Sequence, residues 1–395
     1  MANLRLISLN KDPQNEPSVS CCDKVATSET EILSRLTSCC PNTRQGPQEW
    51  IIGLIDTPAG PVPRISSEWT KTEHWQHIKC RTSAYRNGYD VQPGLYAVGS
   101  PDANSDVIAT ANYKYSFDIV RRDLKGLNLW VLVLDTKGIN VWCAAGKGTF
   151  GTEEFVRRIR AANLDQIVNH KRVIVPQLGA PGVSGHNVTR QTCFRVVFGP
   201  VYSKDIGEFI RGGYKAAPEM RIAKFPLRDR LVLTPMEINP AMKKYPLFAV
   251  IVLFLFGLNP EGIIFADAIK GGLPFLILGL LSVLSGAFLT PLMLPFIPFR
   301  SFALKGWITG MLTIFLASKT MGLSQGTNPL LTVITYLFFP ALSSYWALQF
   351  TGSTTFTNMS GVKKEMKTAI PVYLAVLVIT VLLSVVFKMQ QWGVI

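Results

Sequence analysis

The chain has 395 residues, of which 48% are hydrophobic and only 17% are charged, and its formal net charge is +14. The charge is unevenly divided, because residues 246–395 hold 8 basic and 3 acidic residues while residues 1–245 hold 32 and 23. This division argues against a wholly soluble protein and against a membrane protein without a soluble part. No basic stretch falls in a nucleic-acid-binding motif, so nucleic acid is not an expected partner.

Residues 1–47 are polar and show no sustained hydrophobic period, which predicts a mobile polar tail. The tail contains two pairs of adjacent cysteines, Cys21–Cys22 and Cys39–Cys40. Adjacent cysteines do not readily ligate one tetrahedral metal ion, and the chain has no Cys-x-x-Cys spacing, which argues against a structural zinc site. Capture of a soft metal ion by these thiols and an incidental role both stay open.

Residues 48–220 alternate between short apolar runs and helical patterns, which predicts a Rossmann-like α/β domain with a mostly parallel sheet. Helices are expected at Ser116–Leu124, Glu153–Ala162 and Ser203–Gly212. Ligands bind such sheets at the carboxyl ends of the strands, so the loops after the strands are the candidate site. The expected strands are Trp50–Ile55, Leu95–Val98, Val107–Ala111, Leu129–Leu134, Val173–Pro176 and Phe194–Phe198, with one more at Leu231–Leu233.

The most informative run is Asn140–Gly148, NVWCAAGKG, which follows the expected strand Leu129–Leu134. It does not fit a phosphate-binding P-loop, because Gly148 follows Lys147 and Val141 stands where the first glycine belongs. The segment 146–151 spells the dinucleotide pattern G-x-G-x-x-G, but it lies more than ten residues beyond the strand. The fingerprint glycines normally follow the strand almost at once.

A third hypothesis is that this run forms a short helix over a flat ligand, since its small residues allow close approach. Cys143 would lie in the first turn, near the helix N-terminus and Lys147, which predicts a lowered thiol pKa. A thiolate that faces a planar macrocycle can be an axial ligand of its metal. The alternative is that Cys143 is a small buried apolar residue.

The C-terminal part predicts a linker at residues 221–245 and a transmembrane domain at 246–395. A spanning helix needs about 20 apolar residues. Four spans are also possible, because Asn259, Pro260 and Glu261 interrupt the first of the five apolar segments. The segments hold few ionisable groups, which favours an anchor over a transporter. They lie at about 246–264, 273–297, 302–318, 329–348 and 369–387.

The loop charges predict the orientation of these spans. With the N-terminus inside, seven basic residues lie in cytoplasmic segments and three in outer segments. We therefore expect a multi-pass protein of the cytoplasmic membrane with its α/β domain in the cytoplasm and its C-terminus outside. The start of the chain has no apolar run long enough for a signal peptide, in agreement with this expectation. The inner residues are Lys243, Lys244, Arg300, Lys305, Lys363, Lys364 and Lys367; the outer ones are Lys270, Lys319 and Lys388.

The run Asn140–Gly148 resembles the signature of the mercury-methylation corrinoid proteins, the HgcA family. The resemblance covers about residues 48–395 and includes the runs Ala111–Lys114 and Gly179–His186. That family joins a corrinoid-binding α/β domain to a membrane domain of about five helices. The large subunit of the corrinoid iron–sulfur protein of the acetyl-CoA pathway is similar in its corrinoid domain. This chain lacks that protein's iron–sulfur cysteine motif.

The resemblance implies a cobalamin cofactor, with Cys143 as the catalytic residue and the lower axial ligand of cobalt. Packing roles stay open for Asn140, Trp142 and Lys147, and we expect His74 and His77 at the surface. The other residues implied to bind the cofactor are Asn112, Asn140, Val141, Trp142, Ala144, Ala145, Gly146, Lys147, Gly179, Pro181, Gly182 and Ser184.

The implied activity is transfer of a methyl group from cobalt to inorganic Hg(II), which gives methylmercury. The implied partners are a small ferredoxin with two [4Fe–4S] clusters (HgcB) and a methyltransferase that supplies the methyl group. Two alternatives stay open: a corrinoid methyl carrier of one-carbon metabolism, and a cobalamin-binding membrane transporter or sensor.

Overall fold

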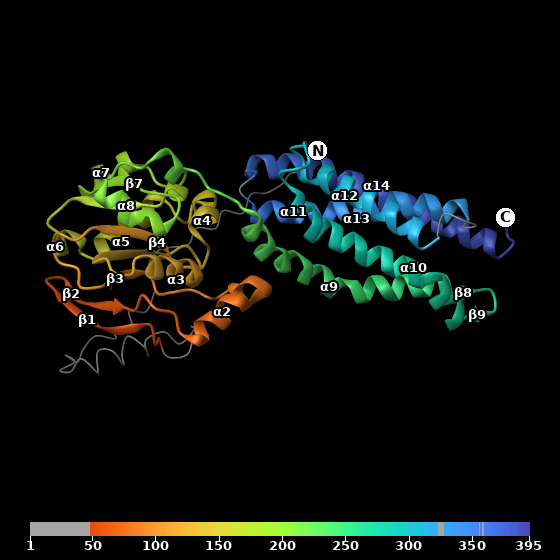
Figure 1. Cartoon of the computed structure of the whole chain (residues 1–395), viewed down its shortest axis with the longest axis horizontal. Coiled ribbons are helices and arrows are strands. Elements are labelled where there is room, and N and C mark those ends of the chain that lie inside the picture. Colours follow the sequence, from red (N-terminus) through yellow and green to blue (C-terminus); the bar gives the residue numbers. More distant parts are fainter. Residues whose placement is uncertain (1–47, 323–327, 355, 358) are drawn as a thin grey trace, which may run out of the picture. The chain divides into compact units, whose positions relative to one another are not determined.

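The structure is a computed structural model that describes residues 48–322, 328–354, 356–357 and 359–395 (Figure 1). The predicted tail, with Cys21, Cys22, Cys39 and Cys40, lies outside the described residues.

The α/β domain is built on a seven-stranded mixed sheet with the order β1-β2-β3-β5-β4-β6-β7. Strands β5, β4, β6 and β7 run parallel to one another, as the alternating pattern predicts. The other half differs from the prediction, because β3 is antiparallel to β5 and β1 forms a hairpin with β2. The strands are β1 (Ile51–Thr57), β2 (Gly60–Ile65), β3 (Gly94–Val98), β4 (Val107–Ala111), β5 (Leu129–Leu134), β6 (Arg172–Val175) and β7 (Arg195–Phe198).

Strand β2 was not expected because it contains Pro61 and Pro63, which are normally excluded from sheet interiors. Both prolines pair with β1 only, while Arg64 and Ile65 alone make the pairing with β3. The prolines, which lack an N–H group, therefore do not interrupt the hydrogen bonds between β2 and β3.

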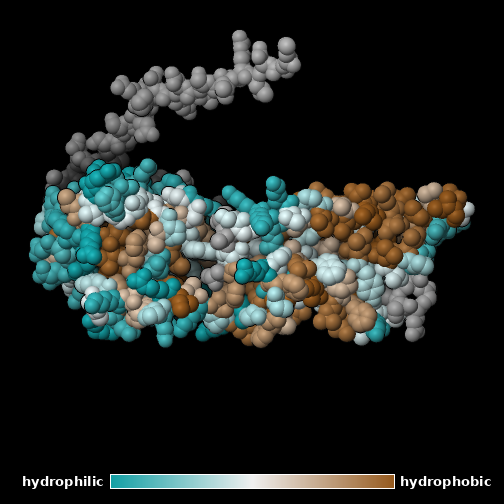
Figure 2. All heavy atoms as spheres, turned by 90° about the horizontal axis from the view of Figure 1, so that it is seen from above, coloured by the Kyte–Doolittle hydropathy of each residue, from teal (hydrophilic) through white to brown (hydrophobic). Residues whose placement is uncertain are grey.

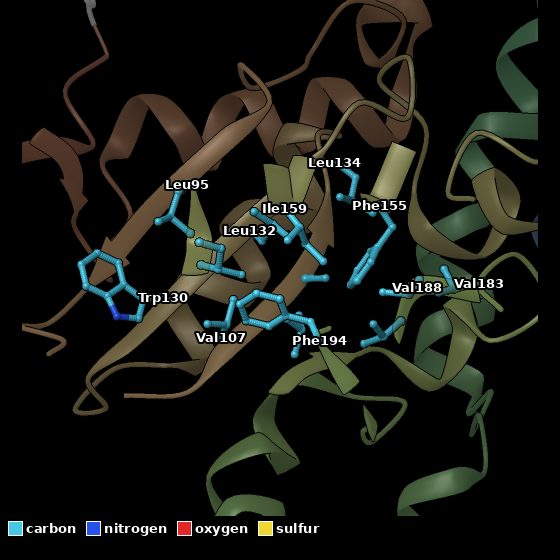
Figure 3. Close-up of a cluster of buried hydrophobic side chains, with 14 of the residues drawn as sticks. Leu95, Val107, Trp130, Leu132, Leu134, Phe155, Ile159, Val183, Val188 and Phe194 are labelled. Atoms are coloured by element: carbon cyan, nitrogen blue, oxygen red, sulfur yellow. The ribbon is translucent and has the colours of Figure 1, made fainter. Parts of the chain in front are cut away.

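Helices cover both faces of the sheet and bury two apolar clusters. On one face, Phe155 and Ile159 of α5 point toward Leu132 of β5 (Figure 3). On the other face, Phe117 of α3 and Phe209 of α8 are fully buried. The three expected helices correspond to α3, α5 and the segment Ser203–Arg211, whereas α2 and α7 were not expected. The helices are α2 (Lys71–Thr82), α3 (Lys114–Asp123), α4 (Val141–Lys147), α5 (Thr152–Ala161), α6 (Leu164–Ile167), α7 (Gly185–Thr192) and α8 (Ile206–Arg211).

The C-terminal part is a set of long helices with a largely hydrophobic surface (Figure 2). Among the described residues, four segments are long and apolar enough to cross a membrane: Leu227–Gly257, Phe265–Met293, Pro329–Gly352 and Ser360–Gln391. The expected span 302–318 is helical but is not among these four. The helices are α9 (Leu227–Gly257), α10 (Phe265–Leu284), which continues through a π-helical turn into α11 (Thr290–Met293), then α12 (Phe302–Thr320), α13 (Pro329–Gln349) and α14 (Met359–Gln391).

The segment 221–245, expected to be a linker, contains the beginning of α9, and the strand expected at Leu231–Leu233 is wrong because these residues are helical. Pro235, Pro240 and Pro246 lie within α9. Prolines normally end or kink a helix, so they hide its early turns from a pattern-based prediction.

Candidate functional site

The run NVWCAAGKG forms the short helix α4, which begins and ends with capping residues. The side chain of Asn140 accepts a hydrogen bond from the backbone N–H of Cys143 at 2.9 Å, and Gly148 ends the helix with a left-handed φ of 81°. Ala144 and Ala145 are buried against the apolar cluster that contains α5. Gly146 and Lys147 are exposed, and Cys143 is half-buried. The helix therefore carries the cysteine on the side that its alanines do not bury.

Asn112 shapes the loop that leads from β5 into α4. Its amide oxygen accepts hydrogen bonds from the backbone N–H groups of Thr136 and Gly138, both at 3.0 Å, and from the hydroxyl of Thr136 at 2.8 Å. The side chain is only 3% exposed. These contacts make Asn112 a positioning residue for the helix that carries Cys143.

The run Gly179–His186 lies against α4. A Cβ atom on Gly182 would lie 2.1 Å from the carbonyl oxygen of Phe150 and 3.1 Å from the Cα atom of Ala145. A Cβ atom on Gly179 would lie 2.5 Å from the ring of Phe150. The structure thus brings this run and the cysteine helix together. Gly182 permits the close packing of one backbone on the other, and Gly179 leaves room for the ring of Phe150.

The two remaining predicted residues of this run are exposed. The side chain of Ser184 caps α7, and its N–H donates a hydrogen bond to the Thr152 hydroxyl at 2.8 Å. Pro181 also lies on the surface, as does His186. Pro181 and Ser184 lie in the segment that leads from β6 to α7, and His186 lies in the first turn of α7.

A cavity of about 340 Å³ lies at the carboxyl ends of β4 and β6. Three predicted site residues, Asn140, Val141 and Trp142, line its wall, and Cys143 directly follows them. Most of the lining is apolar. Besides Asn140, the polar groups come from Thr110, Ser116, Tyr202 and Ser203, which were not predicted. Tyr202 and Ser203 follow β7, so the rule that ligands lie beyond strand ends was the signal that could have found them.

The protonation of Cys143 differs from its prediction. Burial raises the pKa of the thiol above its ordinary value, and this effect outweighs the positive charges of Arg86 and Lys147 and the hydrogen bond to Asn140. The predicted lowering of the pKa is therefore wrong, because burial disfavours the thiolate more than these groups stabilise it. A metal that binds this sulfur has to displace a proton. Within the described residues, no group of three or more His, Cys, Asp and Glu side chains could hold a metal ion by itself.

A buried ionic network joins α2 to α3 and includes Lys114 of the run Ala111–Lys114. The ammonium of Lys114 donates to Glu73 at 2.8 Å, and Nε of Arg121 donates to Asp118 at 2.8 Å. Nε2 of His77 lies 2.7 Å from Asp118. His77 is only 5% exposed, so its predicted surface position is wrong. The network stabilises the packing of two helices.

The α/β domain is similar in sequence to proteins of acetyl-CoA metabolism. Residues 76–210 match a family described as CO dehydrogenase/acetyl-CoA synthase delta subunit. The acetyl-CoA decarbonylase/synthase complex subunit gamma of Methanocaldococcus jannaschii is 31% identical over 138 residues, which are 34% of this chain and 28% of that protein. The subunit gamma of Methanothermobacter thermautotrophicus is 34% identical over 122 residues, which are 30% of this chain and 26% of that protein.

The chain spans less than a third of the length of these relatives. The family match ends at residue 210, before α9 begins. It agrees with the expected similarity to proteins of the acetyl-CoA pathway, and it leaves the long C-terminal helices unmatched.

Proposed function

We propose that the α/β domain is a corrinoid-dependent methyl-transfer module held at a membrane by the C-terminal helices. The observation that carries this proposal is the position of Cys143, half-buried in the first turn of α4 and next to three residues that line the cavity at the strand ends. The match of residues 76–210 to a family of acetyl-CoA metabolism supports the same class of chemistry.

The residues fit a corrinoid whose cobalt is held by a protein thiolate. When bound, the corrinoid would supply a cobalt-bound methyl group for transfer, and a thiolate ligand would make that group richer in electrons. Cys143 would hold the cobalt through Sγ, which would lose its proton on binding. Arg86 and Lys147 would stabilise the thiolate by their charge. Asn140 would fix the first turn of α4 through its bond to the Cys143 N–H.

The apolar cavity suits a second part of the same cofactor. With Cys143 as a cobalt ligand, the benzimidazole of cobalamin would need a binding place on the protein. A mostly apolar cavity with a few hydroxyl groups is the kind of site that binds such a group. We assign the benzimidazole to the cavity beside Trp142 and Tyr202.

Two methyl acceptors have different support. The names of the relatives favour a methyl carrier of one-carbon metabolism. The run NVWCAAGKG and the unmatched membrane-length helices favour Hg(II), as in the HgcA family. The family match includes the run around Cys143, so the comparisons support the methyl carrier better, and Hg(II) as acceptor rests on the resemblance of this run alone.

The mercury hypothesis includes partners and a location. The donors would be a methyltransferase for the methyl group and a ferredoxin with two [4Fe–4S] clusters for electrons. Both would act from the cytoplasm, since the distribution of loop charges favours a cytoplasmic α/β domain if the C-terminal helices cross the membrane.

The ligand assignment is tested by the absorption spectrum of the full chain purified with cobalamin. The wild type is expected to show a thiolate–cobalt band that Cys143→Ala lacks. Cys193→Ala, which removes an exposed thiol at the end of α7, is the matched control and should keep the band. Identical spectra for the wild type and Cys143→Ala would contradict the assignment.

The acceptor is tested separately with the methyl-loaded protein. The mercury hypothesis predicts methylmercury from Hg(II) in the wild type and none in Cys143→Ala. Transfer to a carbon-pathway acceptor without formation of methylmercury would favour the methyl carrier instead.

A further inference from the structure

A second cavity, of about 1120 Å³, opens at the surface of the C-terminal helices between the start of α12, the middle of α13 and the first half of α14. This volume exceeds the roughly 300–1,000 Å³ of common small-molecule sites. Neither the proposed corrinoid chemistry nor the matched segment accounts for the cavity.

The lining changes from polar to apolar in the same direction along two helices. On α14 the lining residues Lys364, Thr368, Val372 and Val376 are four residues apart and so share one face. They extend over about 18 Å of helix. Arg300 lies two residues before α12 and is followed along the cavity by Leu304 and Trp307 of that helix. The cavity therefore has a cationic end and an apolar end.

The cationic end has charges that no neighbour neutralises. Within the described part of the chain, Arg300 and Lys364 form no ion pair. The carboxylate of Glu365, which also lines the cavity, accepts hydrogen bonds from the Ser301 hydroxyl and the Ala303 N–H, both at 2.6 Å. This carboxylate thus binds the N-terminus of α12 and does not pair with either cation. Buried Lys305 donates to the carbonyl of Leu294.

We propose that this cavity binds an anionic phospholipid. Its phosphate would lie between Arg300 and Lys364, and an acyl chain would lie along Leu304, Trp307 and Val376. The cationic end is the one that the loop charges assign to the cytoplasmic leaflet, which is rich in anionic lipids. A small soluble anion would leave the apolar half of the cavity without an occupant. The proposal rests on the membrane location and is independent of the corrinoid.

The test uses the full chain in a neutral detergent with added phosphatidylglycerol, phosphatidylcholine or inorganic phosphate. Native mass spectrometry measures retained lipid, and thermal unfolding measures stabilisation. We expect the protein to retain phosphatidylglycerol and to be stabilised by it, and to show neither effect with phosphatidylcholine or inorganic phosphate. The double variant Arg300→Gln/Lys364→Gln should bind it about 30-fold more weakly, because each basic group near a membrane surface contributes about 1 kcal/mol.

The matched control is Lys363→Gln/Lys367→Gln, which removes two exposed charges from the same helix outside the cavity lining and should retain the lipid. If the first double variant misfolds, Lys364→Gln alone should weaken binding about fivefold. Equal retention of phosphatidylcholine, equal stabilisation by inorganic phosphate, or equal loss in the control would overturn the proposal. Methyl transfer is not measured, so none of these outcomes bears on the corrinoid function.

Discussion

At the scale of residues, the chemistry depends on one thiol whose protonation is set by its neighbours. Cys143 lies near the N-terminus of a helix and near Lys147, and both features favour a thiolate. Burial has the opposite effect and is larger, so the thiol is protonated near neutral pH. Cofactor binding through this sulfur should therefore release a proton and become tighter as the pH rises toward the pKa of the thiol.

The first prediction concerns the alkylation of Cys143 in the corrinoid-free protein. Its rate with iodoacetamide should keep rising with pH beyond about 8.5, the pKa of a free cysteine, since burial raises the pKa of this thiol. Arg86→Gln removes a charge that stabilises the thiolate and should slow the reaction at a given pH. Peptide mass spectrometry over a pH series measures both rates. A rate that saturates below pH 8 would show that the thiolate is favoured instead.

The second prediction concerns the contact between the run Gly179–His186 and α4. Gly182→Ala would place a Cβ atom against the Phe150 carbonyl and should destabilise the protein by about 1–3 kcal/mol. Gly94→Ala is the control, because a Cβ atom there has no neighbour within 4 Å. Thermal unfolding and cobalamin retention are the measurements. A Gly182→Ala protein that behaves like Gly94→Ala would show that the two segments are not in close contact.

At the scale of elements, helices with a regular apolar pattern were predicted and those without one were not. Helix α2 was missed because the side chains that it buries include Glu73 and His77, which are polar. Such a face has no apolar period to detect. Its partners lie on α3, which joins it through Lys114, Asp118 and Arg121.

The third prediction is that Asp118→Asn destabilises the protein by about 3–5 kcal/mol, because it leaves buried cations with too few carboxylates. Glu68→Gln is the control. It breaks an exposed pair with Lys125, in which the side chains are 75% and 68% exposed, and should have almost no effect. Denaturant unfolding of the full chain measures both changes. An equal effect of the two substitutions would contradict a buried network.

The network also predicts a dependence of stability on pH. Burial favours the neutral form of Asp118, but His77, Lys114 and Arg121 outweigh it and lower the pKa of this carboxyl; Lys114 likewise lowers the pKa of Glu73 against its burial. The pKa of each carboxyl is thus lower in the folded protein than in the unfolded chain. The ionised carboxylates therefore stabilise the fold fully above pH of about 4, and this stabilisation is lost as the pH falls through their folded-state pKa. In the Asp118→Asn variant, the free energy of unfolding should therefore fall less than in the wild type when the pH is lowered through this range.

At the scale of the whole molecule, the proposed membrane anchoring makes the side on which the chain ends depend on the number of crossings. Four segments meet the criteria of length and hydropathy, and α12 does not. Helix α12 nevertheless has 19 residues, which span about 28 Å. Its Lys305 is buried and donates to the Leu294 carbonyl, so this charge does not face lipid. We therefore expect five crossings.

The fourth prediction follows from that odd number. With the α/β domain in the cytoplasm, the C-terminus should lie outside. A membrane-impermeant thiol reagent should label a Val394→Cys variant in intact cells, and should label the exposed native Cys193 only after lysis. Labelling of both sites only after lysis would indicate an even number of crossings and a C-terminus inside.

The parallel strands, the cysteine helix and the apolar segments were predictable because their causes lie within a few residues of one another. The alternation of apolar runs predicts β4 to β7, and the cap by Asn140 is a local signal for α4. The antiparallel pairing of β3 with β5 was not predictable, because it joins segments some thirty residues apart that have the same apolar character. The early turns of α9 were hidden by prolines that the helix tolerates.

The sequence by itself determined the charge division, the position of Cys143 at a helix start and the places of the long apolar helices. Only the tertiary structure decided that Cys143 is protonated, that Gly182 supports α4, and that Arg300 and Lys364 line one cavity. The physical reason is that capping and hydrophobic periodicity act over neighbouring residues. Burial, electrostatic fields and close backbone contacts depend on atoms that folding brings together from distant parts of the chain.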